Sequence, residues 1–370
     1  MKKKILFLIH DLGQGGAEKV LVNLVNHMDC TKFDIAVVSL FGGGVNEQFL
    51  NRNIHFSCIY HHNIPANSKW MKLFTPTQLH RKHIKGHFDV EVSYLEGPCA
   101  RIISGCEDKN TKLVSWIHTK YTKEEDICAS FRNRKEAIDC YNKFDYTACV
   151  SEDVRAAFCG FLGFKKPTGV LYNTIESEKI TNLSNQESNV EFSSDTFNII
   201  AVGSLKPVKR YDRLLNIAKK LKNDGYQAHT FILGTGPLKE EFEKFIDANH
   251  LNDCVSLLGY DTNPYKYLAK SDLFVCSSQT EGFSTAATEA LIVGTPVCTV
   301  DVSGMKEMLG DNNEYGIVTE NDEEALYDGI KSLIDNSELL AQYKEKAKER
   351  GKMFSTEKTV KAVEDMLLLL

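Results

Sequence analysis

The chain of 370 residues is predicted to be an α/β protein with two Rossmann-like domains, each built on a doubly wound parallel sheet. Short apolar runs alternate with amphipathic helical stretches along most of the sequence. The length exceeds what one ordinary hydrophobic core supports. Glycine-bearing loops follow several apolar runs, where parallel sheets bind their ligands. These three observations favour two domains with a ligand site at the strand ends.

The first half of the chain contains candidate strands at residues 5–9, 33–40, 54–59, 90–95, 112–117 and 146–150. The first run has only five apolar residues before His10, which is too short for a secretion signal or a membrane span. We therefore expect a buried first strand and at most peripheral contact with a membrane.

A glycine-rich loop at residues 13–16 joins the first strand to a helix that begins near Glu18. Glycine lets a backbone approach a phosphate, and a helix N-terminus offers N–H groups to it. The loop is not a dinucleotide fingerprint, because Glu18 stands where a third glycine is required, and no Gly-Lys-Ser/Thr of a P-loop follows. A phosphate site and a simple tight turn are both open here.

A Glu/Ser/Asn-rich segment, residues 175–195, is the predicted interdomain linker. The predicted domains are residues 1–185 and 186–354. Candidate strands of the second domain lie at residues 197–202, 229–233, 255–260, 272–276 and 295–300. Glycine-bearing loops follow four of them, which indicates a nucleotide-sized cleft on one side of the sheet.

Charge and cysteine content limit the class of protein. The net charge is −6, but residues 1–185 carry 24 basic and 20 acidic side chains, against 20 and 30 in the remainder. An acidic chain without a recognised binding motif disfavours nucleic acid. The eleven cysteines include no Cys-x-x-Cys pair, so we expect reduced thiols of a cytoplasmic protein and neither a disulfide nor a zinc framework.

A basic stretch at residues 69–87 contains no acidic residue and has Trp70, Leu73 and Phe74 interleaved. Its basic side chains are Lys69, Lys72, Arg81, Lys82 and Lys85. Basic and exposed apolar residues together suit an anionic membrane surface, which would place the protein peripherally on the inner face of the cell membrane. A solvated loop and helix face is the alternative.

Two carboxylates, Glu281 and Glu289, are separated by seven residues across a strand–loop–helix unit. The strand is residues 272–276 and the helix residues 285–293, so Glu289 lies about one turn into the helix, on the side of the loop. The N–H groups of residues 283–285 should be unpaired donors at the helix start. Glu281 could equally complement the helix dipole and Glu289 lie on a solvated face.

His118 directly follows the strand at residues 112–117, and Glu96 follows the strand at residues 90–95. Both positions are carboxyl ends of strands, where ligands bind. For His118, an interfacial histidine without a chemical role is the alternative.

Seven motifs occur in an order that resembles the retaining nucleotide-sugar glycosyltransferases of family four, which have the GT-B fold. They are Gly15-Gly16-Ala17-Glu18, Gly203-x-Leu205-x-Pro207-x-Lys209, Gly234-x-Gly236-Pro237, Glu281-Gly282-Phe283, Glu289-Ala290, Gly294-Thr295-Pro296-Val297 and Gly304. The resemblance covers nearly the whole chain. It implies two domains facing a central cleft, with donor binding in the C-terminal domain and acceptor binding in the N-terminal one. It also implies that residues 355–370 form a helix that packs back on the first domain, with a buried apolar end.

The resemblance also implies roles for individual residues. Catalytic roles would fall to His118, Lys209 and Glu281, and the acceptor side to Glu96 and His118. Donor contacts would come from Gly15, Gly16, Ser204, Lys206, Lys209, Gly234, Gly236, Tyr260, Glu281, Gly282, Phe283, Ser284, Thr285 and Glu289. Glu289 would bind the ribose hydroxyls, Glu281 and His118 the donor sugar, and Lys209 the departing diphosphate. Ser204 departs from the family, which usually has arginine there; Lys206 or Arg210 could supply the missing cation.

The resemblance implies transfer of a hexose-type sugar with retention, from a UDP-sugar rather than a GDP-sugar, to a saccharide or lipid-linked saccharide. No cofactor or metal is expected, and the absence of an Asp-x-Asp sequence supports a metal-independent reaction. Front-face departure and attack, with the leaving phosphate as base, is favoured over Glu281 as a covalent nucleophile. A nucleotide-sugar epimerase, a sucrose-type hydrolytic enzyme and a non-catalytic nucleotide-binding relic are the alternatives.

Overall fold

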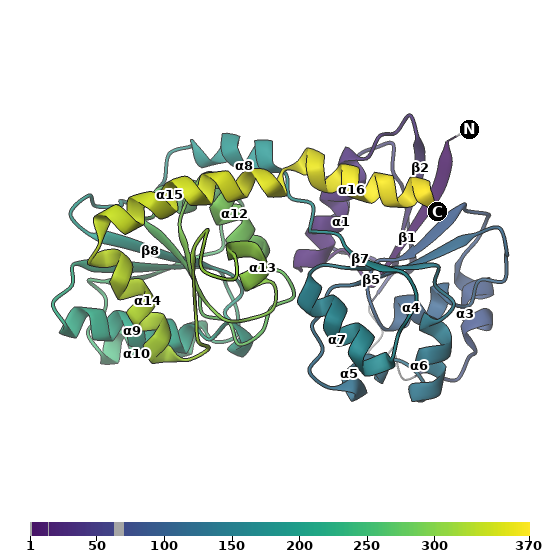
Figure 1. The fold of residues 1–370 in the computed structure, drawn as a ribbon, viewed down its shortest axis with the longest axis horizontal. Helices are drawn as coiled ribbons and strands as arrows, with labels where there is room; N and C mark the ends of the chain where they lie inside the picture. Colours follow the sequence, from purple (N-terminus) through teal and green to yellow (C-terminus); the bar gives the residue numbers. More distant parts are fainter. Residues whose placement is uncertain (1, 14, 63–69) are drawn as a thin grey trace. The chain divides into compact units, whose positions relative to one another are not determined.

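The computed structural model describes residues 2–13, 15–62 and 70–370, and the chain divides into two compact units (Figure 1). One unit comprises Met1–Ile175 with Thr356–Leu370, and the other comprises Glu176–Ser355. The boundary lies after Ile175 and not after residue 185, because the expected linker contains helix α8 (Ser177–Ser184), which packs on α11 (Tyr265–Leu268) and α12 (Thr285–Val293) of the second unit.

The first unit contains a 7-stranded parallel sheet with the order β3-β2-β1-β4-β5-β6-β7. Its strands are β1 (Lys3–Ile9), β2 (Phe33–Phe41), β3 (His55–Tyr60), β4 (Val90–Ser93), β5 (Lys112–Ile117), β6 (Tyr146–Cys149) and β7 (Thr168–Val170). Its helices include α1 (Gly16–His27), α3 (Pro76–His83), α4 (Pro98–Ile103), α5 (Glu124–Cys128), α6 (Arg134–Tyr141) and α7 (Glu152–Leu162), with the 3-10 turn η1 (Glu47–Phe49). Ile5 to Ile9 are fully buried, as expected for a strand covered on both faces.

The second unit contains a 6-stranded parallel sheet with the order β10-β9-β8-β11-β12-β13. The strands are β8 (Phe197–Val202), β9 (Ala228–Leu233), β10 (Val255–Gly259), β11 (Leu273–Cys276), β12 (Val297–Val300) and β13 (Ile317–Thr319). Further helices are η2 (Pro207–Lys209), α9 (Tyr211–Asn223), α10 (Lys239–Ala248), α13 (Met305–Leu309), α14 (Glu323–Ile334), α15 (Ser337–Gly351) and η3 (Lys352–Phe354). The predicted doubly wound parallel sheets are confirmed.

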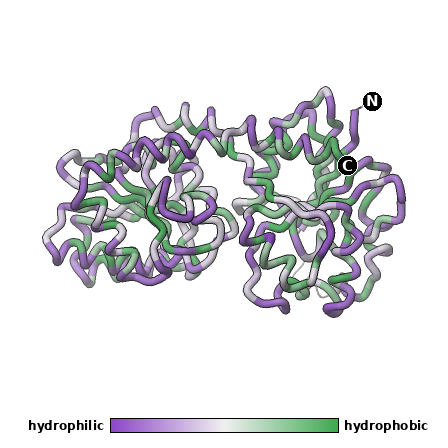
Figure 2. The backbone as a smooth tube through the Cα atoms, viewed as in Figure 1, coloured by the Kyte–Doolittle hydropathy of each residue, from purple (hydrophilic) through white to green (hydrophobic). Residues whose placement is uncertain are grey.

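Strand order reverses beside the first strand of each sheet, since β1 lies between β2 and β4, and β8 between β9 and β11. The chain therefore leaves these central strands in opposite directions, and the loops after them separate into a crevice. Figure 2 shows the hydrophobic segments concentrated along the strands and hydrophilic stretches along the outer helices, which is the pattern of a sheet covered on both faces.

The C-terminal helix α16 (Thr356–Leu369) belongs to the first unit and packs against α1. Lys3 Nζ donates to the Leu367 carbonyl at 2.7 Å, and the Asp29 N–H donates to Glu364 Oε1 at 2.6 Å. The expectation of a buried apolar end is only half right: Met366 and Leu367 are buried, but Leu368 and Leu369 are 50% and 88% exposed. A helix turns successive residues to different faces, so five consecutive apolar residues cannot all face one neighbour.

Across the described residues, none of the helices combines the length and the apolar composition needed to cross a membrane.

Candidate active site

Two glycine loops lock together at the carboxyl edge of the second sheet. A Cβ on Gly234 would lie 1.9 Å from the Gly203 carbonyl oxygen, and one on Gly236 would lie 2.4 Å from the Leu205 carbonyl oxygen. The Leu205 N–H also donates to the Thr235 carbonyl at 2.9 Å. These contacts require glycine at both positions and bring the backbones after β8 and β9 together at the strand ends.

Lys209 and Glu281 form an ion pair between η2 and the loop after β11. Lys209 Nζ lies 2.7 Å from Glu281 Oε1, and Ser278 Oγ donates to the same oxygen at 2.7 Å. The Ser277 hydroxyl donates to the Lys209 carbonyl at 2.9 Å. The side chains of Lys209 and Glu281 are 25% and 13% exposed, so the structure brings two predicted site residues together in a partly desolvated position.

The charge of Lys209 is secured by this pair. Burial disfavours its charged form, but the carboxylate and hydrogen bond of Glu281 outweigh that effect and raise the Lys209 pKa above its ordinary value. The site therefore presents an ammonium group at neutral pH, which a phosphate group could take over from Glu281.

Helix α12 begins at Thr285, where the sequence predicted it, with Ser284 as its N-cap. The Ser284 hydroxyl accepts from the Ala287 N–H at 3.3 Å, so one donor of the first turn is satisfied internally. Within the described chain, the N–H of Thr285 has no hydrogen-bond partner. Phe283 anchors the loop, because its ring is buried and lies 5.6 Å from that of Phe354. The helix start thus retains an open donor beside the Lys209–Glu281 loop.

Glu289 lies inside α12 and is only 5% exposed, which excludes the solvated-face interpretation. The Tyr265 hydroxyl donates to Glu289 Oε1 at 3.3 Å. A buried carboxylate is costly unless polar groups compensate it, so its position needs a structural or ligand partner. The sequence did not indicate Tyr265, which lies 24 residues away and shares no local pattern with Glu289.

Tyr260 follows β10 at the same edge and is 69% exposed. Lys206 is also exposed, and it has no ion pair among the described residues. Arg210, in contrast, donates to both carboxylate oxygens of Asp212 at 3.0–3.1 Å. Of the two cations considered as replacements for an arginine at Ser204, only Lys206 has an uncompensated charge.

In the first unit, Glu96 joins the carboxyl ends of β4 and β5. Its Oε1 accepts from the N–H groups of His118 and Thr119, each at 2.7 Å. Burial raises the Glu96 pKa above its ordinary value, although these N–H groups oppose the shift. The two residues predicted for the acceptor side are therefore adjacent, and Glu96 positions the backbone that carries His118.

The His118 ring packs against Tyr94, with ring centroids 4.8 Å apart. Burial lowers the His118 pKa to about 3, so the imidazole is neutral at physiological pH. Its Nε2 atom is buried and has no hydrogen-bond partner within the described residues. A buried polar atom of this kind is rare in folded proteins, and a ligand hydroxyl could supply the missing partner.

Gly15 is the N-cap of α1, and Gly16 is its first residue. A Cβ on Gly15 would lie 2.0 Å from a Glu18 carboxylate oxygen, so this side chain returns to the start of its own helix. Burial and the charge of Asp11 raise the Glu18 pKa. The helix start predicted to receive a phosphate thus already has a carboxylate beside it.

The basic stretch of the first unit is anchored by two arginines. The buried Arg101 donates to the carbonyls of Met71 at 2.8 Å and Phe74 at 2.7 Å, and Arg132 Nε donates to the Lys72 carbonyl at 2.6 Å. Leu73, between them, is 79% exposed, and Phe74 is 37% exposed.

The charges of this stretch are only partly available. Lys82 Nζ lies 5.7 Å from the Phe74 ring, and Lys85 Nζ donates to the Arg81 carbonyl. Arg81 forms an ion pair with Glu107 at 2.6 Å, so its charge is compensated by a residue outside the stretch. Lys69 lies outside the described residues. We call Lys72, Leu73, Phe74 and Lys82 the basic-apolar surface.

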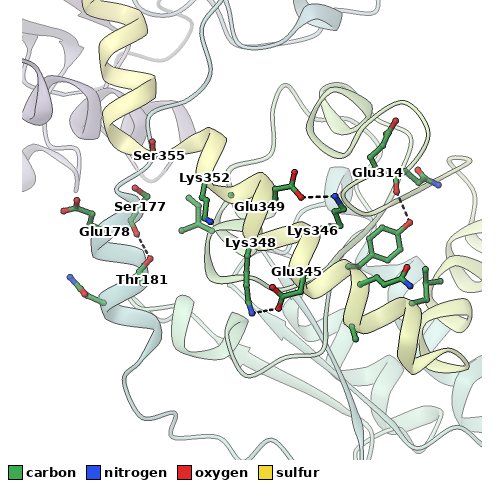
Figure 3. Close-up of a pocket in the computed structure, with 18 residues that line it drawn as sticks. Ser177, Glu178, Thr181, Glu314, Glu345, Lys346, Lys348, Glu349, Lys352 and Ser355 are labelled. Carbon is green, nitrogen blue, oxygen red and sulfur yellow. Dashed lines mark hydrogen bonds and ion pairs between the residues drawn. The ribbon is translucent and has the colours of Figure 1, made fainter.

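A separate groove of about 1470 Å³ lies within the second unit, between α8 and α15 (Figure 3). It is lined by charged residues that pair with one another, Lys346 with Glu349 at 2.9 Å and Lys348 with Glu345 at 2.8 Å. None of the predicted site residues lines it, so it is not the candidate active site.

Two parallel-sheet units of this topology, with a lysine–glutamate pair and a second, buried glutamate at a helix start, define a glycosyltransferase of the GT-B fold. The family model for Glycosyltransferase Family 4 matches residues 14–179, and the model for Glycosyl transferases group 1 matches residues 184–350. The chain belongs to the family-four glycosyltransferases, as the sequence motifs indicated.

Among individual relatives, the chain is 30% identical to a Campylobacter jejuni protein over 362 residues, which span 95% of this chain and 96% of the relative. That protein is N-acetylgalactosamine-N,N'-diacetylbacillosaminyl-diphospho-undecaprenol 4-alpha-N-acetylgalactosaminyltransferase. It is also 26% identical over 246 residues to poly(ribitol-phosphate) alpha-N-acetylglucosaminyltransferase of Staphylococcus aureus, covering 65% of this chain and 47% of that protein.

Among solved structures, Anabaena HepE in complex with UDP matches all of both chains with a TM-score of 0.78 at 19% identity. Staphylococcus aureus TarM in complex with Fondaparinux, alpha-GlcNAc-glycerol and UDP matches 98% of this chain and 99% of its own with a TM-score of 0.72 at 16% identity. At these identities the likeness establishes the fold.

Proposed function

We propose that the protein transfers an N-acetylhexosamine or related hexose from UDP to a saccharide on a lipid diphosphate, with retention of anomeric configuration. The observation that carries the proposal is the Lys209–Glu281 pair beside the start of α12, with the buried Glu289 one turn further on. The Campylobacter relative's name specifies a diphospho-undecaprenol acceptor and an alpha linkage, and HepE binds UDP. These names support the acceptor class, the stereochemistry and the base.

The chemistry follows from where charge develops. Breaking the bond between sugar and phosphate leaves negative charge on the diphosphate and positive character on the sugar ring. Lys209 and the N–H donors of α12 would stabilise the first, with Lys206 as a second cation. Glu281, released from Lys209, would accept hydrogen bonds from sugar hydroxyls, and Glu289 from the ribose. No metal is required by this set, in line with the absence of an Asp-x-Asp sequence.

A substrate panel tests the proposal. The purified protein is incubated with UDP- and GDP-linked hexoses and N-acetylhexosamines, with and without polyprenyl-diphosphate saccharides, and nucleotide release and product anomer are followed. We expect acceptor-dependent UDP release and an α-linked product, also in the presence of a chelator. Epimerised nucleotide sugar without nucleotide release, or an inverted product, would contradict the proposal.

Glu289→Ala is expected to weaken UDP binding by about 1–3 kcal/mol, or roughly 5- to 150-fold, because ribose hydroxyls lose their acceptor. Isothermal titration calorimetry measures the change. Glu240→Ala is the matched control, since Glu240 is an exposed helix carboxylate of the same unit. Unchanged affinity in a folded Glu289→Ala protein would remove Glu289 from the nucleotide site.

We further propose that the basic-apolar surface binds anionic lipid, which would place the enzyme on the inner face of the cell membrane with its lipid-linked acceptor. Two features support this. Leu73 and Phe74 are exposed although their backbone is held by buried or half-buried arginines, so they are presented without a folding cost at the membrane. Lys72 and Lys82 lie on the same segment and helix, where each basic group near such lipids contributes about 1 kcal/mol.

Lys72→Glu with Lys82→Glu is expected to abolish binding to phosphatidylglycerol vesicles in a sedimentation assay. Electrostatic attraction becomes repulsion, while activity on a short soluble acceptor should persist. Lys143→Glu with Lys165→Glu changes the charge equally at exposed positions of the same unit and should leave binding intact. Full vesicle binding by the first double variant would reject the membrane surface.

A further inference from the structure

Three metal-ligating side chains from separate elements meet in the first unit. Glu91 lies on β4, His80 on α3 and Cys106 in the loop after α4, and their ligand atoms are all within 4.8 Å of one another. His80 Nε2 is 2.8 Å from Glu91 Oε2, and Cys106 Sγ is 3.9 Å from Glu91 Oε1. The carboxylate thus has one oxygen toward the imidazole and the other toward the thiol.

Glu91 is an unusual residue for its position. β4 is a central strand between β1 and β5, and Glu91 is in register with Leu6 and Leu113. Central parallel strands are ordinarily apolar, and the Glu91 side chain is only 3% exposed. Burying a carboxylate is expensive unless a cation accompanies it. His80 supplies one such partner, but an ion pair alone leaves the adjacent Cys106 without a role.

The donor set identifies the class of cation. One imidazole nitrogen, one carboxylate oxygen and one thiol sulfur form a ligand set that suits Zn²⁺. Tetrahedral zinc with its usual bond lengths holds such atoms roughly 3.3–3.6 Å apart. The two observed separations, 2.8 and 3.9 Å, lie on either side of that range. Small side-chain movements would therefore suffice to bind an ion.

We infer that His80, Glu91 and Cys106 form a three-ligand site for a divalent ion of the zinc class, with water completing the tetrahedron. Binding would displace the proton between His80 and Glu91 and the proton of the Cys106 thiol, so the sulfur binds as thiolate and protons are released to solvent. No electron transfer is involved. Sequence spacing gave no sign of this site, because its ligands do not form a Cys-x-x-Cys motif.

The site is structural in this interpretation. Glu91 is near the amino end of β4, and the α4–β5 loop lies at the same edge of the sheet, whereas Glu96 and His118 follow the carboxyl ends of β4 and β5. A metal here would fasten α3 and the Cys106 loop to the central strand. Because α3 carries Lys82, the ion would also fix part of the basic-apolar surface, without contacting the reacting groups.

Cobalt titration of the full chain tests the inference independently of activity. The protein is reduced, stripped with a chelator and titrated with Co²⁺, whose thiolate charge-transfer and tetrahedral ligand-field bands report a sulfur ligand. We expect one bound ion, displaced by Zn²⁺. Cys106→Ser should lose the charge-transfer band, and His80→Gln should weaken binding at least tenfold.

Cys58→Ser is the matched control. Cys58 Sγ lies 3.7 Å from His61 Nδ1, a second thiol–imidazole contact that lacks a buried carboxylate. The bands should survive in this variant. Retention of the charge-transfer band in Cys106→Ser, its loss in Cys58→Ser, or no Co²⁺ binding by the folded stripped protein would overturn the inference. Should Cys106→Ser fail to fold, His80→Gln, altered at a more accessible ligand, gives the same decision.

Discussion

Lys209→Ala is expected to lower kcat by about 100- to 1000-fold, which is the typical effect of removing one preorganised group that stabilises transition-state charge. Lys209 is the basic side chain that the structure holds against Glu281, and its raised pKa keeps it charged. The free energy of unfolding should change by no more than about 1 kcal/mol, because the pair is partly exposed. Steady-state kinetics with the best UDP-sugar and urea denaturation measure the two effects.

Lys219→Ala serves as the control for Lys209→Ala, since Lys219 is an exposed lysine of the following helix, α9, without an ion pair among the described residues. It should leave both quantities unchanged. If the Lys209 variant lost stability in proportion to its activity, Lys209 would be a structural residue. Glu281→Gln should also lower turnover, and a double variant no worse than either single one would mean that the two residues act as a unit.

Arg101→Met is expected to destabilise the protein by about 3–5 kcal/mol, the cost typical of breaking a buried ion pair by removing one partner. The Arg101 side chain is 1% exposed, and its guanidinium lies 2.9 Å from Glu136. Its loss would also leave the Met71 and Phe74 carbonyls without their donor. Urea denaturation of the two proteins gives the difference.

Arg155→Met provides the comparison for Arg101, because Arg155 forms a surface pair with Glu152 on α7 and is 41% exposed. Its expected cost is below about 1 kcal/mol. Equal costs for the two variants would show that Arg101 is not a buried anchor. Arg101→Lys should recover only part of the stability, since an ammonium group cannot serve the carboxylate and both carbonyls in the planar fork of a guanidinium.

Much of the fold could be predicted because its strands are apolar runs with a strong local signal. The strands that sequence reasoning missed, β7 and β13, are short and only half-buried. They gain their structure from pairing with β6 and β12, a tertiary effect that leaves no pattern in the sequence. The domain boundary was misplaced for a related reason: the polar α8 resembles a linker, although one face packs on the second unit.

The helix start at Thr285 was predictable, since Ser284 and the preceding Gly282 are local signals. Pairing between distant residues was not. The contact of Lys209 with Glu281, that of Tyr265 with Glu289 and the ion pair of Arg101 with Glu136 each join segments that only the fold brings together. The roles of the site residues remain predictions, which the variants above test.

The position of α16 has a consequence for how the protein is made. The helix that completes the first unit is encoded last, so α1 lacks its covering partner while the ribosome translates the intervening residues 176–355. Domains ordinarily fold in the order in which they emerge. Here the second unit emerges entire before the first, and the nascent chain must keep the exposed face of α1 from aggregating until the final turns arrive.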